Sequence, residues 1–238
     1  MQHKWLLVIL IGTLITHPSH AQTVNDILSR YELASGFNAR QKIKTITSIG
    51  KTTQLGNTVP ISIIQKRPNK YRFDVHLDEG RVTQAFDGTS GWAFNPFIST
   101  DTLKMEGSEL SQIKESADFD GILHTFRQRG FSAKLIGKVK IGTQNTFKIQ
   151  ILKPNGESMN FYLDENTYLV IKTSIDLFIN GLPYASESFF GDFRRVGGMT
   201  LPYLIQSKNG AMVSETKIDT VRFNEPMEDY YFQCKHAK

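Results

Sequence analysis

Apolar residues recur at every second position along most of the chain from Thr45 onward, in short runs that end at turn signals such as Leu55-Gly56 and Asn209-Gly210. A period of two places alternate side chains on opposite faces of a β-strand. Turn signals at intervals of about 8 to 12 residues favour an all-β sheet or barrel. The pattern therefore predicts a mainly β protein with about eleven or twelve antiparallel strands.

The predicted strands fall into two groups. The first group is a meander: Thr45–Gln54, Val59–Arg67, Lys70–Leu77, Arg81–Phe86 and a short strand that contains Trp92 and Phe94. The second group follows residue 130: Ser132–Lys140, Phe147–Leu152, Ser158–Leu163, Val170–Ile179, Tyr184–Phe193, Leu201–Ser207 and Val213–Phe223. Several runs have one apolar and one mostly polar face. This alternation suits a single, strongly curved sheet with a wet outer face and an apolar inner face.

Near the N-terminus the apolar period is helical instead. Thr23–Gly36 is predicted to be a helix, because four apolar residues share one face: Val24, Ile27, Leu28 and Tyr31. Thr23 is placed to cap this helix, with Asp26 at the capping-box position, and Gly36 is placed to end it. A short second helical piece is expected near Ala39–Ile43.

Residues 98–130 interrupt the strand pattern between the two groups. Ser108–Glu115 has a helical pattern with Leu110 and Ile113 on its apolar side, and Ile122–Arg127 is expected to add a short helical turn. An insertion of this length is usually functional and often a lid, whereas a plain crossover between two halves of the sheet is the alternative. Since the apolar inner face must be covered, we expect an open antiparallel β half-barrel covered by a helical lid.

The first 21 residues have the features of a secretory signal peptide. Lys4 gives a positive start, Trp5–Ile15 is apolar but too short to span a bilayer, and Ser19 and Ala21 are small residues at the positions that signal peptidase reads. We expect cleavage after Ala21, which leaves residues 22–238 as one exported domain.

The charge of the chain argues against nucleic acid as a partner. The formal net charge is +5 at pH 7, and the Lys and Arg residues are spread along the chain without the basic run that a nucleic-acid surface needs. Such a mild excess allows weak attraction to anionic lipid headgroups without demonstrating it.

No motif for catalysis, metal or cofactor binding stands out. The sequence has no Gly-x-Ser-x-Gly nucleophile elbow, no His-x-His pair and no phosphate-cradling glycine loop. Asp118 and Asp120 lack the further ligands of a calcium loop. Cys234 is the only cysteine, so an internal disulfide is excluded. We therefore expect no enzyme activity, no metal and no cofactor, although a catalytic pair assembled from distant residues stays open.

The stretch FDGTSGWAFNPF, residues 86–97, is unusually aromatic for a turn region. A period of two allows Trp92 and Phe94 to face the same side, and Phe97 follows after Asn-Pro. These aromatic side chains suit either the protein core or a wall that contacts an apolar ligand. The long insertion that follows Phe97 favours a cavity wall for at least one of them.

Two motifs together resemble a known family. Lys66–Phe73, with the sequence KRPNKYRF, followed by the aromatic stretch of residues 86–97, is similar to the periplasmic outer-membrane lipoprotein carriers of the LolA-like family. The order of the motifs, the N-terminal helix and the signal peptide agree, and the resemblance extends over the mature chain. Ala117–Gly121, with the sequence ADFDG, also looks like one branch of this family.

The resemblance implies a lidded half-barrel with a hydrophobic cavity for the acyl chains of lipoproteins, located in the periplasm. It implies that Arg67 bonds the lid and tunes its opening, and that Leu110 and Ile113 belong to the lid. The expected ligand-binding residues are Arg67, Tyr71, Phe73, Trp92, Phe94 and Phe97.

The resemblance also implies partners: acylated lipoproteins or lipids, an inner-membrane release complex and an outer-membrane acceptor. Two departures leave the cargo open, because Phe73 stands where the family often has Trp and no basic cluster marks a docking face. The alternatives on the same fold are a periplasmic binder of another lipid and an envelope-stress sensing module.

Overall fold

The computed structural model describes residues 22–179 and 182–234. The expected signal peptide, residues 1–21, and the expected turn at Asn180-Gly181 lie outside the described residues. Among the described residues, no helix is both long enough and apolar enough to span a bilayer.

The described strands form one antiparallel sheet of thirteen strands, in the order β6-β5-β4-β3-β2-β1-β13-β12-β11-β10-β9-β8-β7. The first half consists of β1 (Thr45–Gln54), β2 (Asn57–Lys66), β3 (Lys70–Leu77), β4 (Gly80–Phe86), β5 (Gly91–Phe94) and β6 (Leu103–Lys104). The second half consists of β7 (Ser132–Ile141), β8 (Gln144–Leu152), β9 (Ser158–Asp164), β10 (Val170–Ile179), β11 (Leu182–Val196), β12 (Met199–Asn209) and β13 (Met212–Phe223). The expected open, mainly β half-barrel is confirmed. The one strand without a predicted counterpart is β6, because two residues give no alternation to detect.

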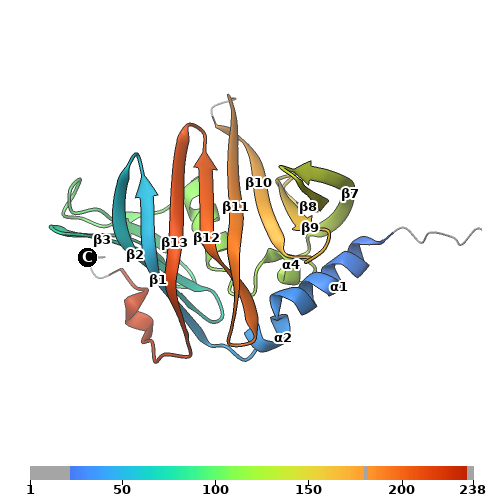
Figure 1. Cartoon of the computed structure of the whole chain (residues 1–238). Coiled ribbons are helices and arrows are strands. Elements are labelled where there is room, and N and C mark those ends of the chain that lie inside the picture. Colours follow the sequence, from blue (N-terminus) through green and yellow to red (C-terminus); the bar gives the residue numbers. More distant parts are fainter. Residues whose placement is uncertain (1–21, 180–181, 235–238) are drawn as a thin grey trace, which may run out of the picture.

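The course of the chain explains the insertion between the two groups of strands. The chain starts at the middle of the sheet with β1, proceeds outward to β6 at one edge, and resumes with β7 at the other edge before returning to β13 beside β1. The intervening segment carries α3 (Gly107–Ser116) and α4 (Ile122–Thr125), which lie behind the sheet in Figure 1, on its concave side. The insertion therefore connects the two edges and also covers the inner face.

The N-terminal helix has the caps that its sequence predicts. In α1 (Val24–Ser35), the Thr23 hydroxyl accepts the Asp26 N–H at 3.2 Å, and the Asp26 carboxylate accepts the Thr23 N–H at 2.9 Å. Gly36 ends the helix at φ 77°, and a Cβ there would lie 2.1 Å from the carbonyl oxygen of Gly198. Glycine is therefore required both for the turn and for close packing. The following helix, α2 (Phe37–Arg40), begins slightly earlier than expected.

The two ends of the half-barrel differ. At the end where β1 and β12 begin, which we call the closed end, α1, α2 and α4 pack onto the sheet with two apolar clusters. The other end carries the β1–β2 and β12–β13 turns, which stand at the top of Figure 1. We call it the open rim.

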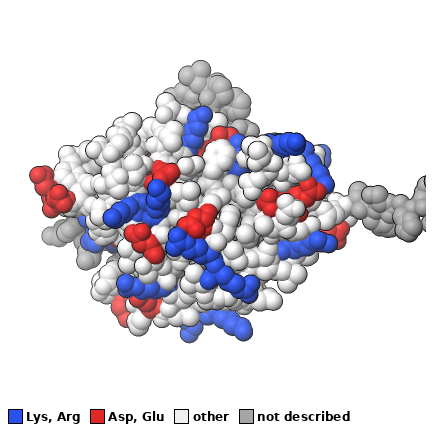
Figure 2. Space-filling model, viewed as in Figure 1, with Lys and Arg blue, Asp and Glu red and all other residues white. Residues whose placement is uncertain are grey.

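The C-terminal segment covers part of the outer face. After β13 the chain continues to a short 3₁₀ helix, η1 (Asp229–Tyr231), and Phe232 beyond it is fully buried. Elsewhere on the face seen in Figure 2, basic and acidic side chains are interspersed among uncharged residues. No large patch of one sign is visible on that face.

Candidate ligand-binding site

The helix α3 lies on the inner face of β4 and β5 with few apolar contacts. Ile113 is buried and Leu110 half-buried, and both pack in a cluster with Phe86 and Met105. A Cβ on Gly91 would lie 3.1 Å from each of these two α3 side chains. Glycine at the start of β5 thus lets the helix approach the strand closely. The two expected lid residues are the ones that hold α3 to this half of the sheet.

A cavity of about 640 Å³ lies on the other side of α3, between the helix and the second half of the sheet. Its apolar wall comes from Met159 on β9 and Ile175 on β10. Hydroxyl and amide groups line much of the rest, among them Ser108, Ser111, Gln112, Ser186, Ser188 and Asn209. The cavity is therefore amphipathic, whereas the family resemblance implies a hydrophobic one.

The strand register explains this lining. Ile175 pairs with Ser186, and Ser186 pairs with Asn209, so these three side chains share the inner face. The Ser186 hydroxyl donates to the Asn209 side-chain oxygen at 2.6 Å. In the next inward-facing row, the hydroxyls of Ser188 and Ser207 lie 3.3 Å apart. Small hydroxyl residues at a period of two leave room beneath α3 where larger side chains would fill the space.

A second hollow of about 370 Å³ borders the opposite flank of α3. Tyr71 and Ala93 line it from the sheet, and Gln112 and Ser116 of α3 border both hollows. Burial raises the pKa of the Tyr71 hydroxyl to about 12, so this group stays protonated at physiological pH. The helix therefore separates two hollows on one concave face.

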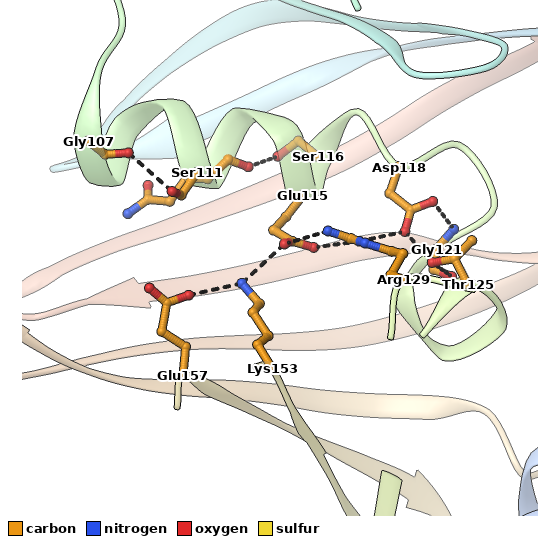
Figure 3. A network of polar contacts seen from close by, with 11 residues as sticks. Gly107, Ser111, Glu115, Ser116, Asp118, Gly121, Thr125, Arg129, Lys153 and Glu157 are labelled. Atoms are coloured by element: carbon orange, nitrogen blue, oxygen red, sulfur yellow. Dashed lines mark hydrogen bonds and ion pairs between the residues drawn. The ribbon is translucent and has the colours of Figure 1, made fainter. Parts of the chain in front are cut away.

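An ion-pair network ties the C-terminal half of α3 to its surroundings (Figure 3). Glu115 of α3 accepts hydrogen bonds from Arg129 at 3.0 and 3.1 Å and pairs with Lys153 at 3.1 Å. Lys153, directly after β8, also pairs with Glu157, and Arg129 also pairs with Asp118, each at 3.1 Å. Glu115 thus links the helix to the β8–β9 hairpin and to the segment after α4.

The charged groups beside the cavity are paired with one another. The hydrogen bond from Lys153 holds the pKa of the Glu157 carboxyl below its usual range. In the part of the chain that the structure describes, no group of three or more His, Cys, Asp or Glu residues is arranged to hold a metal ion.

Arg67 lies at the closed end, where it connects the sheet to the crossover. Its terminal nitrogens bond both carboxylate oxygens of Asp120 at 2.7 and 2.5 Å, and its guanidinium lies 4.4 Å from the centre of the Phe119 ring. It also donates to the carbonyl oxygens of Ile43 at 2.7 Å and Arg40 at 2.9 Å, at the end of α2. Only arginine offers this many donors in one plane. The contact between Arg67 and the covering segment is present, and its effect on opening is a matter for experiment.

The structure separates the expected aromatic residues onto two faces. Tyr71 and Phe73 face inward, but Ala85 pairs with both Arg72 and Trp92, which puts Trp92 on the outer face. Trp92 is 7% exposed and donates its indole N–H to the carbonyl oxygen of Phe232 at 2.7 Å. Tyr71 and Trp92 therefore lie on opposite faces of the sheet, and a role of either residue in ligand binding stays a prediction.

The other two aromatic residues also lie away from the cavity. Phe94 shares the outer face with Trp92, at a hollow of about 350 Å³ that Arg72 also lines. Phe97 follows β5 at the open rim and is 51% exposed. Asp118 and Asp120, the pair considered for calcium, are each engaged by an arginine.

Sequence reasoning missed the residues that line the cavity. The signal was the spacing of Ser186 and Ser188 on one strand and of Ser207 and Asn209 on the next. Small polar residues at a period of two resemble an outer face, so only the register reveals that they face inward.

The sequence matches no family model and no curated protein. Solved structures nevertheless share its fold. A LolA superfamily protein from Nitrosomonas europaea is 13% identical with a TM-score of 0.59, covering 90% of this chain and 98% of that one. An outer membrane lipoprotein-sorting protein domain from Vibrio parahaemolyticus, described as putative, is 10% identical with a TM-score of 0.57, covering 87% and 97%. A DUF1329 family protein from Desulfovibrio piger is 12% identical with a TM-score of 0.53, covering 87% and 97%.

These likenesses extend over nearly the whole of each solved chain, so they concern the complete half-barrel and its cover rather than a shared hairpin. Sequence identities of 10% to 13% show a shared fold only, so the function has to be argued from the site itself. By its sheet and its helical crossover, the chain is a protein of the LolA-like fold.

Proposed function

We propose that this protein is a periplasmic carrier that binds the acyl chains of lipoproteins, or another lipid, between α3 and the concave face of the sheet and moves them towards the outer membrane. The observation that carries the proposal is the cavity of about 640 Å³ beneath a helix with few contacts. Its size falls within the range of about 300 to 1,000 Å³ that is usual for small-molecule sites. Two neighbours of the same fold are described as a LolA superfamily protein and a lipoprotein-sorting domain.

The lining suggests how an amphiphile would lie. Met159 and Ile175 offer apolar contact, to which each buried methylene contributes about 0.8 kcal/mol. Ser186, Ser188 and Asn209 offer hydrogen bonds to a glycerol, ester or amide group at the head of the chain. A lipidated cysteine or a phospholipid has both parts, so the amphipathic lining supports a complete amphiphile better than a bare hydrocarbon.

The helix α3 is proposed as the movable cover. Most of its residues are exposed, and only Ile113 is buried. Segments with few buried contacts open at low free energy. Lifting the N-terminal half of α3 would join the two hollows on its flanks into one groove.

Lipidated proteins are the proposed cargo, with an inner-membrane release complex and an outer-membrane acceptor as proposed partners. These roles come from the resemblance, and the export that they require rests on the expected signal peptide.

Binding of a fluorescent fatty acid, such as 11-(dansylamino)undecanoic acid, tests the proposal directly. Ser188→Trp fills the cavity and should weaken binding at least about tenfold, whereas Gln206→Trp, on the exposed outer face of the neighbouring strand, should leave it unchanged. Mass spectrometry of the native protein should find copurified lipid, and a labelled triacylated lipopeptide should compete with the probe.

The unfolding midpoint of each variant guards against misfolding, and Met159→Trp fills the same cavity from a different strand. The proposal fails if the native protein binds neither the fatty acid nor the lipopeptide, or if the inner and outer substitutions have equal effects.

A further inference from the structure

A small hollow of about 200 Å³ lies at the closed end, where α1, α2 and α4 meet the sheet (Figure 1). We call it the closed-end hollow. Three polar side chains border it, Tyr31 of α1, Arg40 of α2 and His124 of α4. Among the described residues, none borders both this hollow and the cavity beneath α3. The two spaces can therefore take up different molecules.

Arg40 brings a positive charge to the closed-end hollow without a carboxylate to balance it. Its Nε donates to the carbonyl oxygen of Phe119 at 2.6 Å. In the described part of the chain, its two terminal nitrogens form neither a hydrogen bond nor an ion pair. Burial lowers the pKa of the Arg40 guanidinium, as expected for a charge that is partly removed from water. A cation in such a place is stabilised when an anion or several acceptors face it.

The other two polar groups of the hollow also lack hydrogen bonds. The Tyr31 hydroxyl has no partner within residues 22–179 and 182–234, and burial raises its pKa, so it remains a donor at neutral pH. The His124 side chain is 3% exposed, and its Nδ1 is enclosed without a hydrogen bond, 3.8 Å from a carboxylate oxygen of Glu32. Buried polar groups are nearly always hydrogen-bonded, so three such groups around one hollow define a site for a polar ligand.

The acidic groups nearby are engaged by other arginines. Asp120 also borders the hollow, but Arg67 bonds both of its carboxylate oxygens, at 2.7 and 2.5 Å. Asp118 accepts a hydrogen bond from Arg129 at 3.1 Å. The charge of Arg40 is therefore the one that an anionic ligand would balance.

The rest of the lining limits the size and character of this ligand. Val170, Phe193 and Leu201 form an apolar wall on the sheet side. At the roughly 30 Å³ that a water occupies in the liquid, the hollow holds about seven groups of that size. A guanidinium binds a carboxylate through two parallel hydrogen bonds. The lining thus suits a carboxylate with a short or branched hydrocarbon part, and it is too small for the long acyl chain of a lipid.

We propose that the closed-end hollow binds a small apolar carboxylate, with Arg40 and Tyr31 as donors to the carboxylate and with Val170, Phe193 and Leu201 around its hydrocarbon part. The bound anion balances the charge of Arg40 and connects α1 to α2 through its two oxygens. The inference goes beyond the carrier role and can hold or fail independently of it.

Thermal unfolding with 4-methylpentanoate tests the inference, in a buffer at pH 7.5 that contains no other carboxylate. At about 10 mM the acid should raise the unfolding midpoint of the native protein, because it binds only the folded chain. The alcohol 4-methylpentan-1-ol has the same hydrocarbon part without the charge and should not raise it.

Two variants locate the site. Tyr31→Phe removes a hydroxyl that has no partner in the fold, so its stability without ligand should equal or exceed that of the native protein. Its affinity for the acid, measured by isothermal titration calorimetry, should fall at least about fivefold, because a hydrogen bond to a charged group is lost. Arg40→Met should abolish binding, although it also removes the bond to the Phe119 carbonyl oxygen.

Lys42→Met is the matched control, because Lys42 is exposed and does not border the hollow. It removes the same charge and should leave binding of the acid unchanged. The inference is overturned if the native protein does not bind the acid, if Arg40→Met and Lys42→Met behave alike, or if the alcohol or inorganic phosphate binds as well as the acid.

The dansylated fatty acid separates this inference from the carrier role. Tyr31→Phe should retain binding of the probe, and Ser188→Trp should retain binding of 4-methylpentanoate, since each residue borders only one of the two spaces. If Ser188→Trp weakens binding of the small acid as much as Tyr31→Phe does, the acid binds beneath α3 and the inference is wrong. Absence of probe binding in the native protein contradicts the carrier role, and the small acid alone then decides the role of the closed-end hollow.

Discussion

The closed end and the open rim are built from the same strands but differ in how much of their apolar side-chain surface is buried. At the closed end, Phe119 is fully buried, and the guanidinium groups of Arg67 and Arg40 lie 4.4 and 5.3 Å from its ring centre. At the open rim, Phe97 and Leu55 are exposed, and the space beneath α3 is unfilled. The crossover connects the two edges of the sheet, and its helix α3 is held by the ion pairs of Glu115 near its C-terminus and by the apolar cluster of Met105, Leu110 and Ile113.

This difference shows how a curved sheet can be stable and still hold a site. The closed end supplies the buried apolar area, and the open rim is left with residues that folding does not need. A mutation in the packed clusters of the closed end should therefore act on stability first, and one beneath α3 should act on binding.

The largest expected effect is at Phe119. Phe119→Ala should lower the free energy of unfolding by about 4 kcal/mol, because it removes a fully buried ring from a packed cluster. Phe97→Ala, which deletes the same side chain at the open rim, should change stability little. Urea unfolding followed by circular dichroism measures both, and similar losses would end the distinction between the two ends.

Substitution of Arg67 tests how much the polar contacts of the closed end contribute to stability. Arg67→Ala should cost about 3 kcal/mol, because it leaves the Asp120 carboxylate and the carbonyl oxygens at the end of α2 without their donors. The control is Arg194→Ala, which breaks an equally bidentate pair with Asp192 on exposed surface and should have little effect. If Arg67 only tunes opening, Arg67→Ala would instead speed exchange of the bound probe at unchanged stability.

His124 makes the closed end sensitive to acid. It stacks on Phe37 with 3.8 Å between ring centres, and burial, with Arg40 as a further cause and Asp120 opposing, lowers its pKa to about 4. Between pH 6.5, the ordinary pKa of histidine, and about pH 4, the His124 imidazole is protonated in the unfolded chain but neutral in the folded chain. The free energy of unfolding therefore decreases as the pH is lowered through this range. Between pH 7.5 and pH 5 the loss should be about 2 kcal/mol.

A variant that cannot titrate isolates this contribution. His124→Phe should flatten the dependence of the unfolding free energy over that pH range, while Glu32, whose carboxylate lies 3.8 Å from the imidazole, stays in place. An unchanged slope in the variant would mean that other groups cause the acid sensitivity.

Much of the fold followed from local patterns, because their signals are carried by neighbouring residues. Alternation gave the strands, and the Thr23–Asp26 box with Gly36 gave the bounds of the first helix. The role of the insertion as cover and crossover at once could not be read locally, since it depends on β1 pairing with β13, more than 150 residues away in sequence.

The candidate site was predictable only in part, and the reason lies in register. Tyr71 and Trp92 both sit on strands with buried residues on either face, because α3 covers one face and the C-terminal segment around Phe232 covers the other. A strand buried on both faces gives no alternation from which to choose a side. The alternation on β11 was misleading for a different reason: the polar side chains of Ser186 and Ser188 suggested the solvent-exposed face, but both face inward.

The smallest and most specific effect is expected at Glu115, in the last turn of α3, where ion pairs tie the helix to the β8–β9 hairpin and to the segment after α4. Glu115→Gln removes the charge that Arg129 and Lys153 share but keeps an oxygen acceptor (Figure 3). Stability should fall by about 1 kcal/mol or less, because each cation keeps a second carboxylate, from Asp118 and Glu157.

Dissociation of the dansylated fatty acid should become about threefold to fivefold faster in Glu115→Gln, since a weaker anchor lets α3 lift more often. Lys114→Gln, on the exposed side of the same helix and away from both hollows, is the control for loss of a charge on α3. Stopped-flow displacement by unlabelled fatty acid measures both rates. Equal rates in the two variants would mean that α3 does not gate the cavity, and the open rim would then be an entrance without a lid.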